Sequence, residues 1–254
     1  MNGTWEEVLE RCRRFADVTY ENLTKIVRYE QAGSAARARD LDDCFENDLD
    51  SWMGGGTCFS MTWFVYRELL ALGLAPRLLM GHKRKERNVH CALLVAFEGG
   101  EFLFDPGYLI FEPLELPKLL PLSTLPSEAC FPLVPNAVKL VRRRGSLELW
   151  TGYAGQMKLR FEFDLAGVSE AEFKVHWSES FGREMMTYPV LNKLDRERGI
   201  QYYFQKGNLM IRSGRGSTMR QIARAEQPKI LHEIFGIDEA LAEKALRIVE
   251  RRNQ

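Results

Sequence analysis

The sequence predicts an α+β fold with an N-terminal helical bundle, a central antiparallel β-barrel and a smaller C-terminal lid of mixed α and β structure. Changes in the hydrophobic period support this prediction. Apolar residues follow helical spacing in the first quarter, alternate as in strands from about residue 77 to 177, and return to helical spacing near the end. We expect three segments, 1–75, 76–190 and 191–254.

Two helices are expected in the first segment. Thr4 followed by Glu7 has the spacing of a capping box, which opens the first helix. The second follows Cys58 and ends at Gly73, and its apolar face consists of Met61, Thr62, Val65, Leu69 and Leu72.

Short alternating strands are expected in the middle segment. They cover residues 77–80, 89–97, 101–105, 138–142, 147–151, 157–163 and 173–177. Between them, a proline-rich stretch from Pro113 to Pro135 has neither period, so we expect a long surface connection there.

The C-terminal segment begins with a hairpin and ends with two helices. Residues 202–204 and 209–211 flank Gly207 and Asn208, which is a turn signal. Gly236 ends a short amphipathic helix, and Asp238 caps the last one.

The composition is that of an ordinary soluble protein. Of 254 residues, 45% are hydrophobic, and 35 basic residues balance 35 acidic ones. A net charge of zero gives no electrostatic reason to expect a nucleic-acid or membrane partner. Residues 1–31 lack a signal-peptide core, and no run approaches the roughly 18 apolar residues of a membrane span, so we expect a cytoplasmic location. The oligomeric state is undetermined.

The five cysteines predict neither a disulfide framework nor a metal site. Cys12, Cys44, Cys58, Cys91 and Cys130 are scattered and contain no Cys-x-x-Cys pair. Cys12 and Cys91 fall within apolar patterns and are expected to fill the core. We expect no bound metal.

Cys58 is the candidate nucleophile. It follows Gly54, Gly55 and Gly56 at the start of the second helix, where the helix dipole favours a thiolate and the glycines allow a close backbone approach. His90 and Asp105 lie in two successive strands and are the candidate base and its orienting partner.

A contact between His90 and Asp105 sets a condition on the hairpin. If Gly99 and Gly100 alone made the turn, the two residues would share a face but lie four residues out of step, about 13 Å at 3.3 Å per residue. A turn spanning 97–100 reduces this to a two-residue diagonal of about 7 to 8 Å, which these side chains can bridge. The hypothesis therefore predicts the wider turn or a bulge.

Segments around these three residues resemble the arylamine N-acetyltransferases, whose cysteine motif is roughly Arg-Gly-Gly-x-Cys-Phe-Glu. The matching segments are GGGTCFSMTWFVYRELLALGL, NVHCALLV and EFLFDPGYLIFEPLEL, with weaker matches in YENL at 20–23 and LHEIFGI at 231–237. Gly54 stands in place of the family's arginine and Ser60 in place of its glutamate, so a supporting ion pair is missing. Tyr108 replaces a phenylalanine.

The resemblance implies a cysteine-proteinase-like core and acetyl transfer from acetyl-coenzyme A, through Cys58, to an arylamine or hydrazine. We assign substrate binding to Gly56, Thr57, Gly107 and Tyr108. The basic loop from His82 to Arg87 is the candidate contact for the donor's phosphates, through Lys83, Arg84 and Lys85.

Two other classes of function stay open. A thiol hydrolase or a transglutaminase-like amide-forming enzyme would use the same three residues, because the acceptor decides the outcome. A non-catalytic binding module that keeps the fold is the third reading, and it would leave Cys58 buried far from His90.

Overall fold

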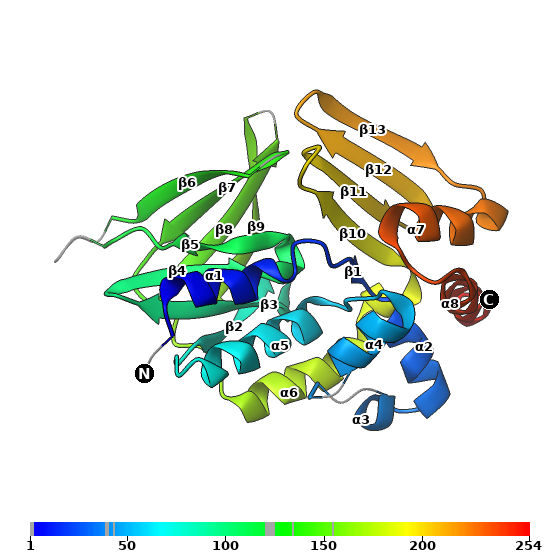
Figure 1. The fold of residues 1–254 in the computed structure, drawn as a ribbon, viewed down its shortest axis with the longest axis horizontal. Coiled ribbons are helices and arrows are strands. Elements are labelled where there is room, and N and C mark those ends of the chain that lie inside the picture. The colour runs from blue at the N-terminus through cyan, green and yellow to red at the C-terminus, as the bar shows by residue number, and fades with distance from the viewer. Residues whose placement is uncertain (1–2, 39–40, 43, 120–124, 134, 154) are drawn as a thin grey trace.

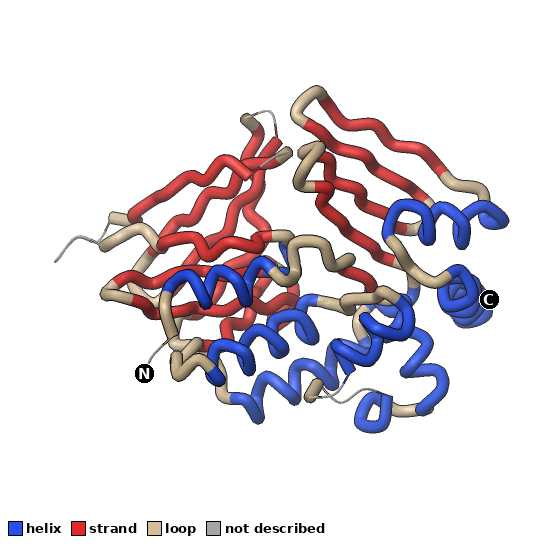
Figure 2. Tube along the Cα trace, in the orientation of Figure 1, coloured by secondary structure: helices blue, strands red, loops and turns tan. Residues whose placement is uncertain are grey.

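The computed structural model describes residues 3–38, 41–42, 44–119, 125–133, 135–153 and 155–254, and it has the expected α+β class (Figure 1). Helices dominate the first part of the chain (Figure 2). Their bounds are α1 Trp5–Arg13, α2 Leu23–Ala32, α3 Ala35–Ala38, α4 Cys44–Trp52 and α5 Cys58–Ala71. The predicted capping box is confirmed, since the Thr4 and Glu7 side chains bond to each other's backbone N–H.

Eight antiparallel strands form one curved sheet that curls toward a barrel (Figure 1). Their order is β5-β4-β3-β2-β9-β8-β7-β6. The bounds are β2 Arg77–Lys83, β3 Glu86–Phe97, β4 Gly100–Asp105, β5 Ile110–Glu115, β6 Ser127–Leu133, β7 Asn136–Arg142, β8 Ser146–Tyr153 and β9 Gln156–Asp164. A short helical turn, η1 Pro106–Tyr108, links β4 to β5.

Strand β3 is buried on both faces, which explains its continuous apolar sequence. Cys91, Leu93 and Val95 join the core beneath the helices. Ala92 and Leu94 join a second core inside the curved sheet. This strand therefore connects the helical part to the sheet, and His90 lies at the point where its buried run begins.

A second sheet of five antiparallel strands forms the C-terminal lid together with two helices (Figure 2). Its order is β1-β10-β11-β12-β13, with β1 Tyr20–Glu21, β10 Val190–Asp195, β11 Ile200–Gln205, β12 Asn208–Ser213 and β13 Gly216–Gln221. The helices are α7 Gln227–Phe235 and α8 Glu239–Arg252. As expected, Gly236 caps the end of α7 and Asp238 caps the start of α8. The division into segments 1–75, 76–190 and 191–254 stays a prediction.

The strand expected at 173–177 is wrong, because this segment lies in α6, Glu170–Glu179. Ser169 caps the helix by accepting a hydrogen bond from the Glu172 N–H at 3.2 Å. Phe173 and Trp177, four residues apart, are buried on one helical face, whereas Val175 between them is 55% exposed. The alternation of apolar and polar residues over 173–177 is therefore also compatible with a helix, and the cap at Ser169 favours the helix.

The proline-rich connection also differs at its ends, where Pro113 lies in β5 and Pro132 in β6. These strands are the two ends of the curved sheet, where a residue without an N–H is tolerated. Pro121, also in this stretch, is outside the described residues. In the portion of the chain covered by the structure, no helix is long and apolar enough to cross a membrane.

Candidate active site

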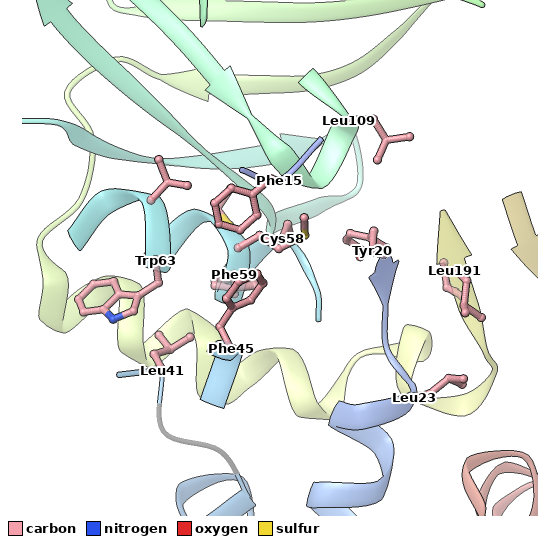
Figure 3. Close-up of a cluster of buried hydrophobic side chains, with 14 of the residues drawn as sticks. Phe15, Tyr20, Leu23, Leu41, Phe45, Cys58, Phe59, Trp63, Leu109 and Leu191 are labelled. Carbon is pink, nitrogen blue, oxygen red and sulfur yellow. The ribbon is translucent and has the colours of Figure 1, made fainter. Parts of the chain in front are cut away.

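Cys58 is the first residue of α5 and is 4% exposed. Thr57 before it is extended, with φ −94° and ψ 178°, and its carbonyl accepts the Met61 N–H at 3.1 Å. The thiol lies between Tyr20 of β1 and the rings of Phe15 and Phe59 (Figure 3). The N–H groups of a first helical turn have no intrahelical acceptor, so the thiol is in a field that stabilises its anion.

The three glycines before Cys58 are each required by their surroundings. Gly56 has φ +82°, in the left-handed region. A β-carbon at Gly55 would lie 2.1 Å from Val18 Cγ1, and one at Gly54 would lie 2.8 Å from Glu21 Oε1. The loop at 54–56 can therefore pack this closely against residues 18–21 only because its residues lack side chains.

Glu21 anchors the glycine loop before Cys58 through hydrogen bonds. Its buried carboxylate accepts hydrogen bonds from the backbone N–H groups of Gly56, at 3.1 Å, and Thr24, at 2.8 Å, and from the Thr24 hydroxyl. An arginine at position 54 has no room beside it. Sequence reasoning missed Glu21 as an individual residue, although the YENL segment that contains it was noted.

The predicted register is confirmed and brings His90 to Asp105, but the two-residue turn is shifted by one position toward the N-terminus rather than widened. Phe97 pairs with Gly100, and Glu98 and Gly99 between them both have positive φ, as in a type I′ turn. His90 Nε2 lies 2.7 Å from Asp105 Oδ2, and both side chains are buried. Because Nε2 is engaged by the carboxylate, Nδ1 is the nitrogen that serves the thiol.

Two neighbours hold the His90–Asp105 pair in place. The ring of Phe161 stacks on His90 with centroids 4.2 Å apart and an interplanar angle of 15°. Tyr108 meets the imidazole edge-on at 5.9 Å, and its backbone N–H donates to Asp105 Oδ1 at 3.0 Å. The imidazole therefore has one defined orientation.

Gly107 marks where the thiol and the imidazole meet. A β-carbon there would lie 2.5 Å from Cys58 Cβ and 3.0 Å from His90 Cε1. The charges of His90 and Cys58 each shift the pKa of the other toward its charged form. The arrangement differs from that of the non-catalytic module, in which the two would be far apart.

The electrostatics favour a thiolate and imidazolium pair. Burial disfavours a charged His90, but the charge and hydrogen bond of Asp105, with the hydrogen bond to Cys58, raise the pKa of His90 to about 10. The hydrogen bond from Cys91 and the nearby His90 and Lys25 charges outweigh burial and hold the pKa of Cys58 well below its usual range. Both shifts favour the proton on the imidazole rather than on the thiol.

Cys91 has a second role besides filling the core. It is fully buried as expected, and its interaction with Cys58 is the largest influence on the pKa of that thiol, which it lowers. Burial and the neighbouring Cys58 raise the pKa of Cys91 well above its usual range. Alternation along the strand correctly placed it on the opposite face from His90, but that rule does not reveal that the opposite face also reaches Cys58.

A cavity of about 720 Å³ opens onto the thiol. Of the residues assigned to substrate binding, it is lined by Thr57, Gly107 and Tyr108, whereas Gly56 is not among its lining residues. Lys83 also lines it, with Nζ 5.9 Å from the Phe161 ring centroid. Arg84 and Lys85 are exposed at the adjacent turn and are not among the lining residues.

Chemically, this arrangement suits a nucleophilic thiol. A buried thiolate, a proton on the adjacent imidazole and a cavity for a carbonyl compound are the elements of covalent acyl transfer. Among the residues that the structure describes, no group of three or more His, Cys, Asp or Glu side chains could hold a metal ion.

No protein-family model matches the chain, and no curated protein matches its sequence. Solved structures do match its fold. The arylamine N-acetyltransferase of Nocardia farcinica has a TM-score of 0.74 at 19% identity, covering 98% of this chain and 90% of that one. The Mycobacterium marinum enzyme in complex with CoA has a TM-score of 0.74 at 18% identity and coverages of 98% and 94%. The Salmonella typhimurium enzyme has a TM-score of 0.65 at 17% identity and coverages of 92% and 88%. The chain thus has the fold of arylamine N-acetyltransferases.

Proposed function

We propose that this protein is an acyltransferase of the arylamine N-acetyltransferase type, with Cys58, His90 and Asp105 as its catalytic triad. The observation that carries the proposal is the Cys58 thiol beside His90, which is bonded to Asp105, at the edge of a cavity. Similarity of fold to enzymes of that name over nearly the whole chain supports the choice of reaction.

In the first half-reaction the Cys58 thiolate attacks the carbonyl carbon of an acetyl thioester. A new C–S bond forms to Cys58, and the bond to the donor's sulfur breaks. The leaving thiolate takes the proton that His90 carries. N–H groups of the first turn of α5 are available to the oxyanion that forms on the way.

In the second half-reaction an aromatic amine or hydrazine attacks the acetylated thiol. His90, now neutral, accepts the proton that the amine loses, and Asp105 stabilises the resulting imidazolium. The bond between the acetyl carbon and Cys58 breaks, which returns the thiolate and imidazolium pair. Thr57, Gly107 and Tyr108 line the space in which the acceptor would lie, and Gly56 shapes the loop before the thiol.

The proposed donor is acetyl-coenzyme A. The M. marinum neighbour was solved with CoA, which supports this choice. Lys83 lines the cavity, and Arg84 and Lys85 follow it at the turn, so this loop is the proposed contact for the donor's phosphates.

Intact-mass spectrometry tests the mechanism and the donor together. Incubation with acetyl-coenzyme A should add about 42 Da, the mass of an acetyl group replacing a proton, and an arylamine should remove it. Cys58→Ala should remain unmodified. The matched control is Cys130→Ala, which lacks an exposed cysteine and should behave as wild type.

The open alternatives predict different results. A hydrolase would lose the adduct to water as fast without an amine as with one. A transglutaminase-like enzyme would be acylated by carboxamides rather than by acetyl-coenzyme A. If no thioester or amide forms an adduct with Cys58, the protein is the non-catalytic binding module.

A further inference from the structure

The cavity carries an excess of positive charge although the chain is neutral. Within the described residues, six cationic side chains line it, against three carboxylates. The cations are Lys25, Lys83, Arg160, Arg183, Arg196 and Arg212, and the carboxylates are Glu86, Glu112 and Glu184. A concave surface with this imbalance attracts anions.

Each of these carboxylates already has a cation of its own. Glu86 lies 3.9 Å from Lys83, Glu112 lies 3.7 Å from Arg196, and Glu184 lies 3.2 Å from Lys206. Glu112 also pairs with Arg13 at 3.2 Å. The negative charge of the three acids is therefore partly neutralised by these cations.

Arg160 of β9 lies in the same cavity as the candidate site. Its Nε donates to the buried Thr151 hydroxyl at 2.7 Å, and both residues line the cavity together with Tyr108. Within the described part of the chain, Arg160 has no carboxylate partner in an ion pair. Its guanidinium is thus oriented by a neutral group and keeps its terminal nitrogens for another acceptor.

Arg212 of β12 comes from the five-stranded sheet, and its charge also influences Tyr108. It donates to Gln201 Oε1 at 3.1 Å and Asn136 Oδ1 at 3.3 Å, and Asn136 donates to Gln201 at 3.1 Å. This network joins the curved sheet to the lid sheet, which lie next to each other in Figure 1. Burial raises the pKa of Tyr108, and the charges of Arg160 and Arg212 both oppose that rise.

We propose that Arg160 and Arg212 form a subsite for an oxyanion on a small-molecule substrate, a carboxylate or a phosphate. The inference rests on the proposed function for the identity of that substrate. Tyr108 meets the His90 ring edge-on at 5.9 Å, and the charges of Arg160 and Arg212 both act on the same tyrosine, so the two guanidiniums lie in the part of the cavity that holds the reacting centre. This placement suits an aromatic amine that carries a carboxylate on its ring, because one small molecule then meets both Cys58 and the arginines, whereas a phosphate of coenzyme A lies at the end of a long pantetheine arm.

Equilibrium binding by calorimetry tests the subsite without requiring turnover. The probes are 4-aminobenzoate and its neutral analogue 4-aminobenzamide for the acceptor, and coenzyme A and pantetheine for the donor. Arg160→Gln and Arg212→Gln should each weaken 4-aminobenzoate binding at least about tenfold and leave 4-aminobenzamide binding unchanged. Arg160→Lys should retain much of the binding, because the charge remains.

Arg196→Gln is the matched control, since Arg196 lines the same cavity but is paired with Glu112. Weaker binding of coenzyme A, with pantetheine and 4-aminobenzoate unaffected, would support the subsite but identify the donor's phosphates as its ligand. An equal loss for 4-aminobenzoate and 4-aminobenzamide, or no loss for any anion, would overturn it. Failure of acetyl transfer in the mass experiment would refute the function and leave these binding results standing.

Discussion

The two ends of the cavity are built in different ways. At the thiol end, Cys58, His90 and Asp105 come from a stretch of fewer than 50 residues and are almost fully buried. At the cationic end, Arg160 and Arg212 come from different sheets, are partly exposed and are held by neutral side chains. A reacting group needs a fixed geometry and a shifted pKa, which burial provides, whereas a binding group must stay open to its ligand.

This difference predicts two kinds of defect. Changes at the thiol end should lower kcat, because the proposed mechanism assigns these groups to the transition state. Changes among the cavity's cations should raise KM or Kd for anionic substrates and spare kcat at saturation.

The largest effect is expected for Asp105→Asn. An amide can hold His90 in the wrong tautomer and cannot stabilise the imidazolium, so kcat should fall at least about a hundredfold. Circular dichroism should show an unchanged fold. Near-normal turnover in the folded variant would mean that Asp105 serves only to cap η1, where it accepts the Tyr108 N–H.

Gly107→Ala should separate the thiol from the imidazole without changing either. The new methyl group would lie 2.5 Å from Cys58 Cβ, so one of the two must move. A displacement of about 1 Å can cost about a hundredfold in rate, and we expect a loss of that order in kcat. Gly182→Ala is the control, because a β-carbon there meets nothing within 4 Å. Equal activity of the two variants would contradict the geometry.

Cys91→Ala should have a smaller effect, on the reactivity of Cys58. The hydrogen bond from Cys91 lowers the pKa of Cys58, so its removal should raise that pKa and reduce the thiolate fraction as the pH falls toward neutrality. The pH midpoint of iodoacetamide labelling should move upward, and labelling near neutral pH should slow several-fold. Cys12→Ala, another buried cysteine, should leave the midpoint where it is. An unmoved midpoint in Cys91→Ala would remove Cys91 from the site.

The smallest effect is expected at the basic loop. Replacing Lys83, Arg84 and Lys85 with alanine should raise KM for acetyl-coenzyme A several-fold and spare kcat, if these side chains meet the donor's phosphates. Alanine at Arg143 and Arg144, near the turn between β7 and β8 and away from the cavity lining, is the control. An unchanged KM would mean that residues outside this loop bind the donor's phosphates.

The sequence predicted features that depend on short stretches of chain. Caps at Thr4 and Asp238 and the helix after Cys58 follow from residues within a few positions of each other. The register of β3 and β4 followed from requiring contact between His90 and Asp105. The error at 173–177 came from a five-residue alternation that a helix satisfies equally well.

By itself, the sequence determined the fold class and the candidate residues Cys58, His90 and Asp105, because periodicity, capping and hairpin register are local rules. Only the tertiary structure showed Glu21 holding the loop at Gly56, Cys91 influencing the pKa of Cys58, and Arg160 and Arg212 sharing the cavity. Those contacts join residues from 33 to more than 50 positions apart in different elements. Their existence depends on how helices and sheets pack, and no spacing along one chain encodes that packing in a form that can be read directly.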